Sequence, residues 1–152
     1  LCAPHTPVLT ARLRTLRARP VLTPANAGQP DAPDDGAARA PAGSLKETLP
    51  EPFAAFCALG NPQAFFAHLG RDGLTPVHTR AFPDHHAYTQ RDLDALTRDA
   101  RRHGARALLT TAKDAVKLRA LDFALPCFAL DVALEVDDAE RLLALVRRAI
   151  GR

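Results

Sequence analysis

The sequence predicts an α/β fold with three layers, in which a mostly parallel sheet of about four to five strands is flanked by helices. From residue 53 onward, short apolar runs typical of buried strands alternate with segments of helical periodicity. Several of these runs lead directly into residues that can cap a helix, as the strand-to-helix turns of parallel sheets do. With 152 residues and a hydrophobic content of 47%, the chain has room for about one domain.

The first third of the chain has a different composition. Nine of the 13 prolines fall in residues 1–52, and residues 23–43 show no apolar periodicity. We therefore expect residues 1–50 to form a largely irregular connector rich in Pro, Ala and Gly, and residues 51–152 to form the α/β lobe. Within the connector, residues 11–19 predict a short basic helix, either solvated or leaning on a membrane surface.

The lobe is predicted to begin with a buried strand from Phe53 to Leu59. Gly60 then leads into a helix that Asn61 can cap, with Pro62 at its first position. The buried stripe of this helix is predicted at Phe65, Phe66 and Leu69.

A second strand is predicted from Leu74 to Phe82. Thr89 can cap the following helix, and Asp92 three residues later completes a capping box. The buried stripe of this helix is predicted at Leu93, Leu96 and Ala100. His103 and Gly104 are expected to end it.

Two further strands and a helix complete the prediction. The third strand is predicted from Ala107 to Thr111, and a fourth covers part of Cys127 to Val136. Asp137 is the expected cap of the last helix. The apolar face of that helix consists of Ala139, Leu142, Leu143, Val146 and Ile150. The sequence thus predicts four strands and at least three helices.

Composition excludes several functional classes. The formal charge is +3, but residues 51–152 carry 14 Lys and Arg against 13 Asp and Glu, which is no electrostatic footprint for nucleic acid. No run approaches the roughly 18 apolar residues that cross a bilayer. The three cysteines lack metal-type spacing and are interpreted as reduced thiols of a cytosolic protein. Because the chain starts at Leu1 and has no Met, we expect it to be a fragment or a processed chain.

Three polar turns follow three predicted strands, at 60–62, 84–86 and 111–114. In parallel sheets, ligands gather where strands end and helices begin, because free backbone N–H groups and the helix dipole point there. If the strands are parallel, the three turns lie at one edge of the sheet. Residues far apart in sequence could then meet at one ligand.

The turn with Asp84, His85 and His86 places a carboxylate beside two imidazoles. A histidine near its usual pKa can act as a general base at neutral pH. Adjacent side chains usually point apart, so we expect one of the two histidines to face the site. A zinc site is a competing interpretation, but no third and fourth ligands occur at recognisable spacing. The structural alternative is that Asp84 caps the turn and both histidines are solvated.

The turn at residues 110–114 contains two threonines, Lys113 and Asp114. A lysine among hydroxyls at a strand end suits a phosphate, whereas the structural alternative is a helix start capped by Asp114 with Lys113 in solvent. Lys117 is expected at the surface. The sequence contains neither the Gly-x-x-x-x-Gly-Lys-Ser/Thr loop nor Gly-x-Gly-x-x-Gly. We therefore expect no cofactor-binding site for ATP or NAD, and no metal site, in this chain.

Together the three motifs resemble those of the C-terminal half of the tetraacyldisaccharide 4′-kinase family, the lipid A 4′-kinases of Gram-negative bacteria. The family carries Gly-Ile-Gly-Asn-Pro, an Asp-His turn and Thr-Thr-Glu-Lys-Asp in this order. The corresponding segments here are 58–62, 82–86 and 110–118, and the resemblance covers roughly residues 45–150. Ala112 stands where the family normally has Glu. That difference puts the role of the third turn and the competence of the enzyme in question.

The resemblance implies the C-terminal lobe of a P-loop kinase that transfers the γ-phosphate of ATP to the 4′-hydroxyl of tetraacyldisaccharide 1-phosphate, forming lipid IVA. ATP and Mg²⁺ would be bound by an N-terminal P-loop domain that this sequence lacks, so the fragment alone should be inactive. The lipid substrate would be met peripherally, at the cytoplasmic face of the inner membrane. A non-catalytic α/β binding or regulatory domain is the alternative from another class.

The resemblance also assigns site residues. His85 matches the histidine that acts with an acidic residue of the N-terminal domain, and Asp84 matches its neighbour in the motif; both are predicted to be catalytic. The residues expected near the substrate or its phosphate are Asn61, His86, Thr110, Thr111, Lys113 and Asp114.

Overall fold

The computed structural model describes residues 8–21 and 48–151. Within these ranges it contains five strands and four helices. In chain order they are β1 (Ala11–Pro20), β2 (Phe53–Cys57), α2 (Pro62–Arg71), β3 (His78–Ala81), α3 (Gln90–Arg102), β4 (Ala107–Thr111), α4 (Ala112–Leu118), β5 (Cys127–Val136) and α5 (Ala139–Ile150). The chain divides into two compact units, one of Leu16–Asp131 and one that joins the N-terminal 15 residues to Val132–Arg152.

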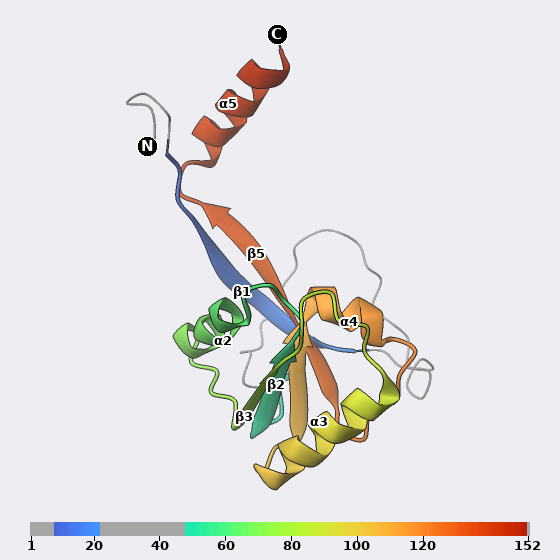
Figure 1. Ribbon diagram of the computed structural model, residues 1–152. Helices are drawn as coiled ribbons and strands as arrows, with labels where there is room; N and C mark the ends of the chain where they lie inside the picture. The colour runs from blue at the N-terminus through green and yellow to red at the C-terminus, as the bar shows by residue number, and fades with distance from the viewer. Residues whose placement is uncertain (1–7, 22–47, 152) are drawn as a thin grey trace. The chain divides into compact units, whose positions relative to one another are not determined.

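The strands form one sheet in the order β1-β5-β4-β2-β3 (Figure 1). β2 is parallel to both β3 and β4, and β4 is parallel to β5. β1 runs antiparallel to β5, as the order of their contacts shows. Arg17 and Arg19 contact Asp131, whereas Val21, later in the chain, donates its N–H to the carbonyl of Cys127, earlier in the chain. The sheet is therefore mixed but mostly parallel, and the predicted fold class is confirmed.

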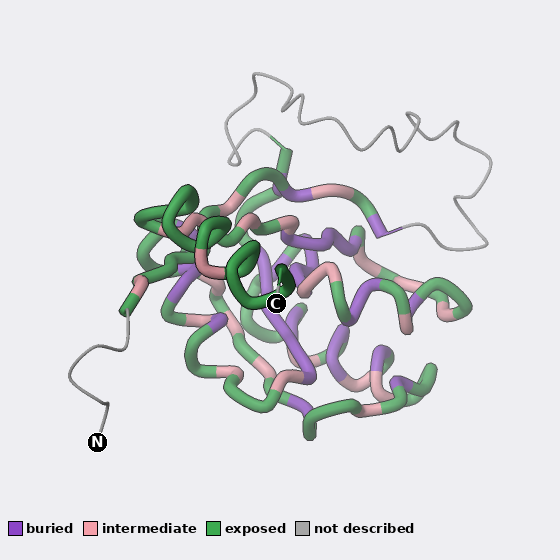
Figure 2. The backbone as a smooth tube through the Cα atoms, turned by 90° about the horizontal axis from the view of Figure 1, so that it is seen from above, coloured by how far each residue is buried: buried purple, intermediate pink, exposed green. Residues whose placement is uncertain are grey.

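Helices cover both faces of the sheet in the larger unit. Alternate residues of each central strand point to opposite faces, so that Phe56 packs with α3 and α4, whereas Phe53 packs with α2. All five residues of β2 are buried, as expected for a central strand of a parallel sheet. Figure 2 shows this buried centre as the purple segments of the chain. The three layers predicted from the sequence are thus present.

The predicted helix starts at Asn61 and Thr89 are confirmed. Asn61 caps α2 by accepting the N–H of Ala64, with Pro62 at the first helical position. Thr89 and Asp92 form the reciprocal capping box at the start of α3, which ends at His103.

Three expectations were wrong. Residues 11–19 form part of β1 rather than a helix, because pairing with β5 outweighs a weak local preference. β3 begins at His78 rather than Leu74, although Leu74 is buried. Asp138, not Asp137, caps α5. The five described strands agree with the predicted four to five. Of the predicted connector, residues 1–50, the stretches 1–7 and 22–47 lie outside the described residues.

The smaller unit contains the outer parts of β1 and β5 together with α5. Arg12 and Arg14 both contact Glu135, and the Thr10 hydroxyl donates to Asp137. No residue of α5 is buried. Its apolar face is therefore exposed, up to 75% at Ile150. No helix in the described part of the chain is both long and apolar enough to cross a membrane.

Candidate functional site

Three strand-to-helix turns meet at the carboxyl edge of the sheet. β2, β3 and β4 are parallel, so the turns that follow them lie at the same edge, as predicted. Nζ of Lys113, in α4, is 3.6 Å from Oδ1 of Asp84, which follows β3. Gly60 approaches the same carboxylate so closely that a Cβ there would lie 3.3 Å from Oδ2. Asp84 is therefore the point at which the three turns come together.

His85 is exposed and has an unusual backbone conformation. Its backbone is in the left-handed region, with a φ of 59°, which is uncommon for a residue other than glycine. Its side chain is 77% exposed, and Nε2 lies 3.7 Å from Oδ2 of Asp84. Its N–H donates to Oδ1 of Asp84 at 3.0 Å. Asp84 thus holds both the backbone and the ring of a histidine that faces solvent.

His86 has different surroundings. Its ring stacks on Phe82 with centroids 4.9 Å apart and meets Tyr88 edge-on. Its Nε2 is 3.1 Å from Oδ2 of Asp92, in the capping box of α3. The ring of His86 is thus part of the packing beneath the turn, whereas that of His85 is presented to solvent.

Asp92 joins the histidine turn to α3. Hydrogen bonds from Thr89, with a smaller contribution from His86, lower the pKa of Asp92 to about 2. The carboxylate therefore stays ionised at any pH at which the protein is expected to work. It fixes His86 and the first turn of α3 together.

Asp114 lies inside the protein. Its side chain is fully buried, and its Oδ2 accepts the N–H of Ala58 at 3.0 Å and the hydroxyl of Thr111 at 2.9 Å. Thr111 in turn caps α4 by accepting the N–H of Asp114. The carboxylate therefore joins the end of β2 to the start of α4. The sequence predicted Asp114 in the vicinity of the substrate or its phosphate, and in the structure its carboxylate links two turns.

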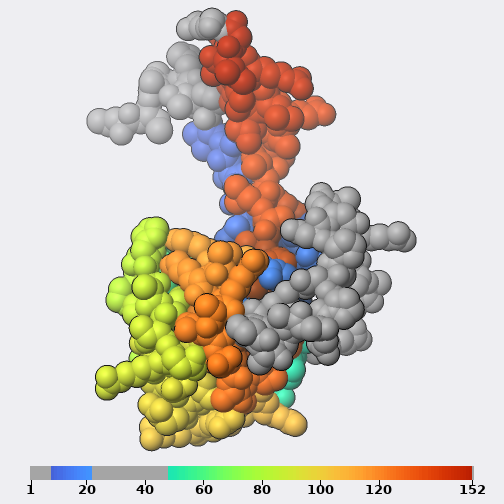
Figure 3. Space-filling view, turned by 90° about the vertical axis from the view of Figure 1, so that its right-hand side faces the viewer, coloured from blue at the N-terminus to red at the C-terminus, as the bar shows by residue number. Residues whose placement is uncertain are grey.

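The two lysines of α4 both reach the histidine turn. Lys113 is half-exposed beside Asp84. Lys117 was expected at the surface, yet its side chain is only 28% exposed, with Nζ 3.8 Å from Oδ1 of Asp114. Nζ of Lys117 also donates to the carbonyl of His86 at 3.4 Å. Figure 3 shows the segment that follows β3 (yellow-green) beside α4 (orange).

Two predicted residues of these turns, Asn61 and Thr110, have structural roles or surroundings of their own. Asn61 uses its side-chain oxygen to cap α2, and Thr110 is fully buried in β4. Tyr88, which was not among the predicted site residues, is buried, and its hydroxyl has no hydrogen-bond partner among the described residues. Burial and Asp114 both raise the pKa of Tyr88. Its position just before the cap of α3 was the only sequence signal that could have indicated it.

The cysteines that the structure describes are buried. Desolvation raises the pKa of Cys57 to about 11 and raises that of Cys127 further. Both thiols are free and protonated at neutral pH. Among the described residues, no three His, Cys, Asp or Glu side chains are grouped to hold a metal ion.

Comparison with known proteins identifies the family. The model of the LpxK family, tetraacyldisaccharide-1-P 4′-kinase, matches residues 5–151. The chain belongs to this family. Curated members include the tetraacyldisaccharide 4′-kinase of Methylobacterium radiotolerans, 46% identical over 97 residues, which are 64% of this chain and 29% of that protein. The kinase of Methylobacterium nodulans is 43% identical over 117 residues, 77% of this chain and 32% of that protein. The chain thus spans about a third of the length of these relatives.

A solved structure supports the fold. The crystal structure of LpxK from Aquifex aeolicus in complex with ATP matches 97% of this chain and 38% of its own, with a TM-score of 0.50 and 22% sequence identity. The likeness supports the α/β fold. The family membership itself rests on the sequence matches.

Proposed function

We propose that this chain is the C-terminal part of a kinase of lipid A biosynthesis that transfers the γ-phosphate of ATP to the 4′-hydroxyl of tetraacyldisaccharide 1-phosphate. Family membership supports the reaction class. The observation that carries the assignment within the chain is the exposed His85, held by Asp84 where three turns meet. Strained backbone at a solvent-facing histidine is characteristic of functional sites.

In this proposal His85 takes the proton of the sugar hydroxyl as that oxygen attacks the phosphorus. Phosphoryl transfer depends chiefly on positioning and on charge stabilisation. A lobe other than the one that binds ATP can therefore supply the base that takes the proton of the acceptor hydroxyl. Asp84 accepts the backbone N–H of His85 and lies beside its ring, so it orients the imidazole and stabilises the imidazolium that forms. Asp84 thereby acts with His85 in the catalytic step.

Lys113 is the cation best placed for a phosphate. It is half-exposed and only loosely paired with Asp84 at 3.6 Å, so an anion could draw its ammonium group outward. ATP and Mg²⁺ supply the transferred phosphoryl group and are bound in this proposal by an N-terminal P-loop domain. The chain itself contributes the groups around the acceptor hydroxyl. The acyl chains of that acceptor place the reaction at the surface of the inner membrane.

The test is the rate of 4′-phosphorylation by the complete protein with His85→Ala and His85→Asn. Asn adopts a positive φ more readily than Ala does, so the second variant removes the imidazole with less backbone strain. We expect each variant to lower kcat by about 100-fold or more with little loss of stability. The matched control is His103→Ala, because His103 is an exposed histidine at the end of α3, away from the three turns.

Normal turnover in both His85 variants would overturn the catalytic assignment. Absence of 4′-kinase activity in the unmodified complete protein would instead favour a non-catalytic binding or regulatory role for the lobe. A large loss in His103→Ala as well would show that the assay reports folding rather than chemistry.

A further inference from the structure

We propose that Lys117 is a positioning residue for His85, which rests on the proposed catalytic role of that histidine. Lys117 lies one helical turn after Lys113, so both side chains leave the same face of α4. The two contact the histidine turn on either side of His85. Lys113 reaches the side chain of Asp84, and Lys117 reaches the carbonyl of His86.

The ion pair between Lys117 and Asp114 differs from a surface ion pair because its carboxylate is buried. Nζ is 3.8 Å from Oδ1 of Asp114, whose carboxylate is fully buried. Oδ1 has no hydrogen bond of its own within the described residues, while Oδ2 is occupied by Ala58 and Thr111. The ammonium group is therefore the cation that faces the less satisfied oxygen of a buried anion. Its position is consequently set from within the protein.

These contacts connect the carboxyl edge of the sheet to the histidine turn. Asp114 accepts the N–H of Ala58, at the end of β2. Lys117 contacts Asp114 and also donates to the carbonyl of His86, so it joins the two segments. Residue 86 is also held through its ring by Asp92. With residues on both sides fixed, the left-handed conformation of His85 is maintained although its own ring is solvated.

The inference predicts that Lys117 affects catalysis through His85 and not through binding. Lys117→Met keeps most of the aliphatic length but removes the ammonium group. In the complete kinase we expect it to lower kcat about 10-fold while KM for ATP and for the lipid acceptor changes less than about 2-fold, because displacement of a catalytic group by about 1 Å costs up to about 100-fold. Lys117→Arg, which retains a donor and a charge, should recover much of the loss.

A double-mutant comparison separates positioning from a general structural effect. If Lys117 acts through His85, then adding Lys117→Met to His85→Asn should lower kcat by less than about 2-fold, because the group that it positions is already gone. The same 10-fold loss in both backgrounds would overturn the proposal. Arg119→Met is the matched control, since it removes an exposed cation two residues further along the chain and should leave kcat unchanged.

A second measurement does not depend on kinase activity. With the chain labelled with ¹⁵N at histidine, the backbone amide signals of His85 and His86 should shift or broaden in Lys117→Met and stay in place in Arg119→Met. Unchanged signals in the folded Lys117→Met protein would overturn the proposal that Lys117 positions the histidine turn. If the signals move but His85→Asn has normal turnover, Lys117 does position the histidine turn and the proposed catalytic function fails.

Discussion

Replacement of Asp114 by alanine should destabilise the larger unit strongly, because the substitution leaves a buried donor unpaired. Loss of the acceptor for the buried N–H of Ala58 costs about 1–3 kcal/mol. The ion pair with the partly exposed Lys117 adds at most about 1 kcal/mol. We therefore expect the free energy of unfolding to fall by about 1–4 kcal/mol, which is a large part of the stability of a typical domain.

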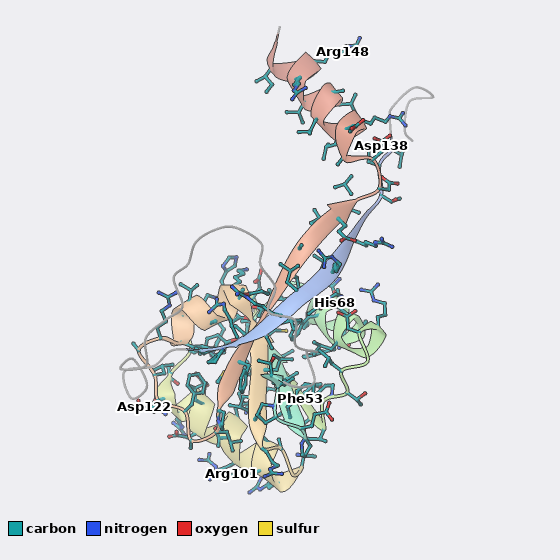
Figure 4. The ribbon with its side chains drawn as sticks, turned by 180° about the vertical axis from the view of Figure 1, so that it is seen from behind. Phe53, His68, Arg101, Asp122, Asp138 and Arg148 are labelled. Atoms are coloured by element: carbon teal, nitrogen blue, oxygen red, sulfur yellow. The ribbon has the colours of Figure 1, made fainter. Side chains whose placement is uncertain are left out.

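The assay is urea unfolding of the chain at pH 7, followed by far-UV circular dichroism. Asp114→Asn provides an internal comparison. Its amide oxygen can still accept the N–H of Ala58, so we expect a smaller loss of about 1–2 kcal/mol. Asp122→Ala, on the exposed loop labelled in Figure 4, should stay within about 0.5 kcal/mol of the unmodified chain. The reasoning is refuted if Asp114→Ala loses less than about 1 kcal/mol, or if Asn and Ala are equally destabilising.

Three further predictions concern pH, backbone crowding and the exposed helix. The pKa of Asp92 is about 2 in the folded state, below its usual 3.8. The contribution of its carboxylate to stability is therefore complete above about pH 4 and is lost as the pH falls through about 2. In a plot of Tm against pH, Asp92→Asn should flatten this acidic part. Gly60→Ala brings a Cβ to 3.3 Å from the carboxylate of Asp84 and should lower kcat of the complete kinase several-fold, whereas Gly70→Ala, with open space around it, should leave kcat unchanged and raise the Tm. Leu143→Ser, at a side chain 54% exposed on α5, should change the free energy of unfolding of this chain by less than about 0.5 kcal/mol; a larger loss in urea unfolding would show that α5 is packed in solution.

Features set by neighbouring residues were predictable from the sequence. The cap of α2 at Asn61 and the capping box at Thr89 depend on residues three positions apart. The parallel sheet followed from apolar runs alternating with such helices, and it placed the three polar turns at one edge. These parts needed no knowledge of distant contacts.

Features that depend on distant partners were missed. Residues 11–19 carry only two leucines among arginines, and they become a strand because β5, more than 100 residues away, pairs with them. Asp114 was expected near the substrate or its phosphate, and nothing in the sequence indicated that its side chain is fully buried. Its burial depends on the N–H of Ala58, 56 residues earlier. Lys117 was expected at the surface, and its contact with the carbonyl of His86, 31 residues earlier, could not be read from the local sequence.

The edges of the sheet bear on how the chain behaves at high concentration. A sheet edge exposes unpaired N–H and C=O groups, to which a strand of another molecule can add. One edge here is β3, which has only four residues and carries Arg80. The other is β1, whose Arg17 and Arg19 are held by Asp131. The short length of β3 and the arginines on both edges disfavour such addition, so self-association of this chain should proceed through apolar side chains rather than through growth of the sheet.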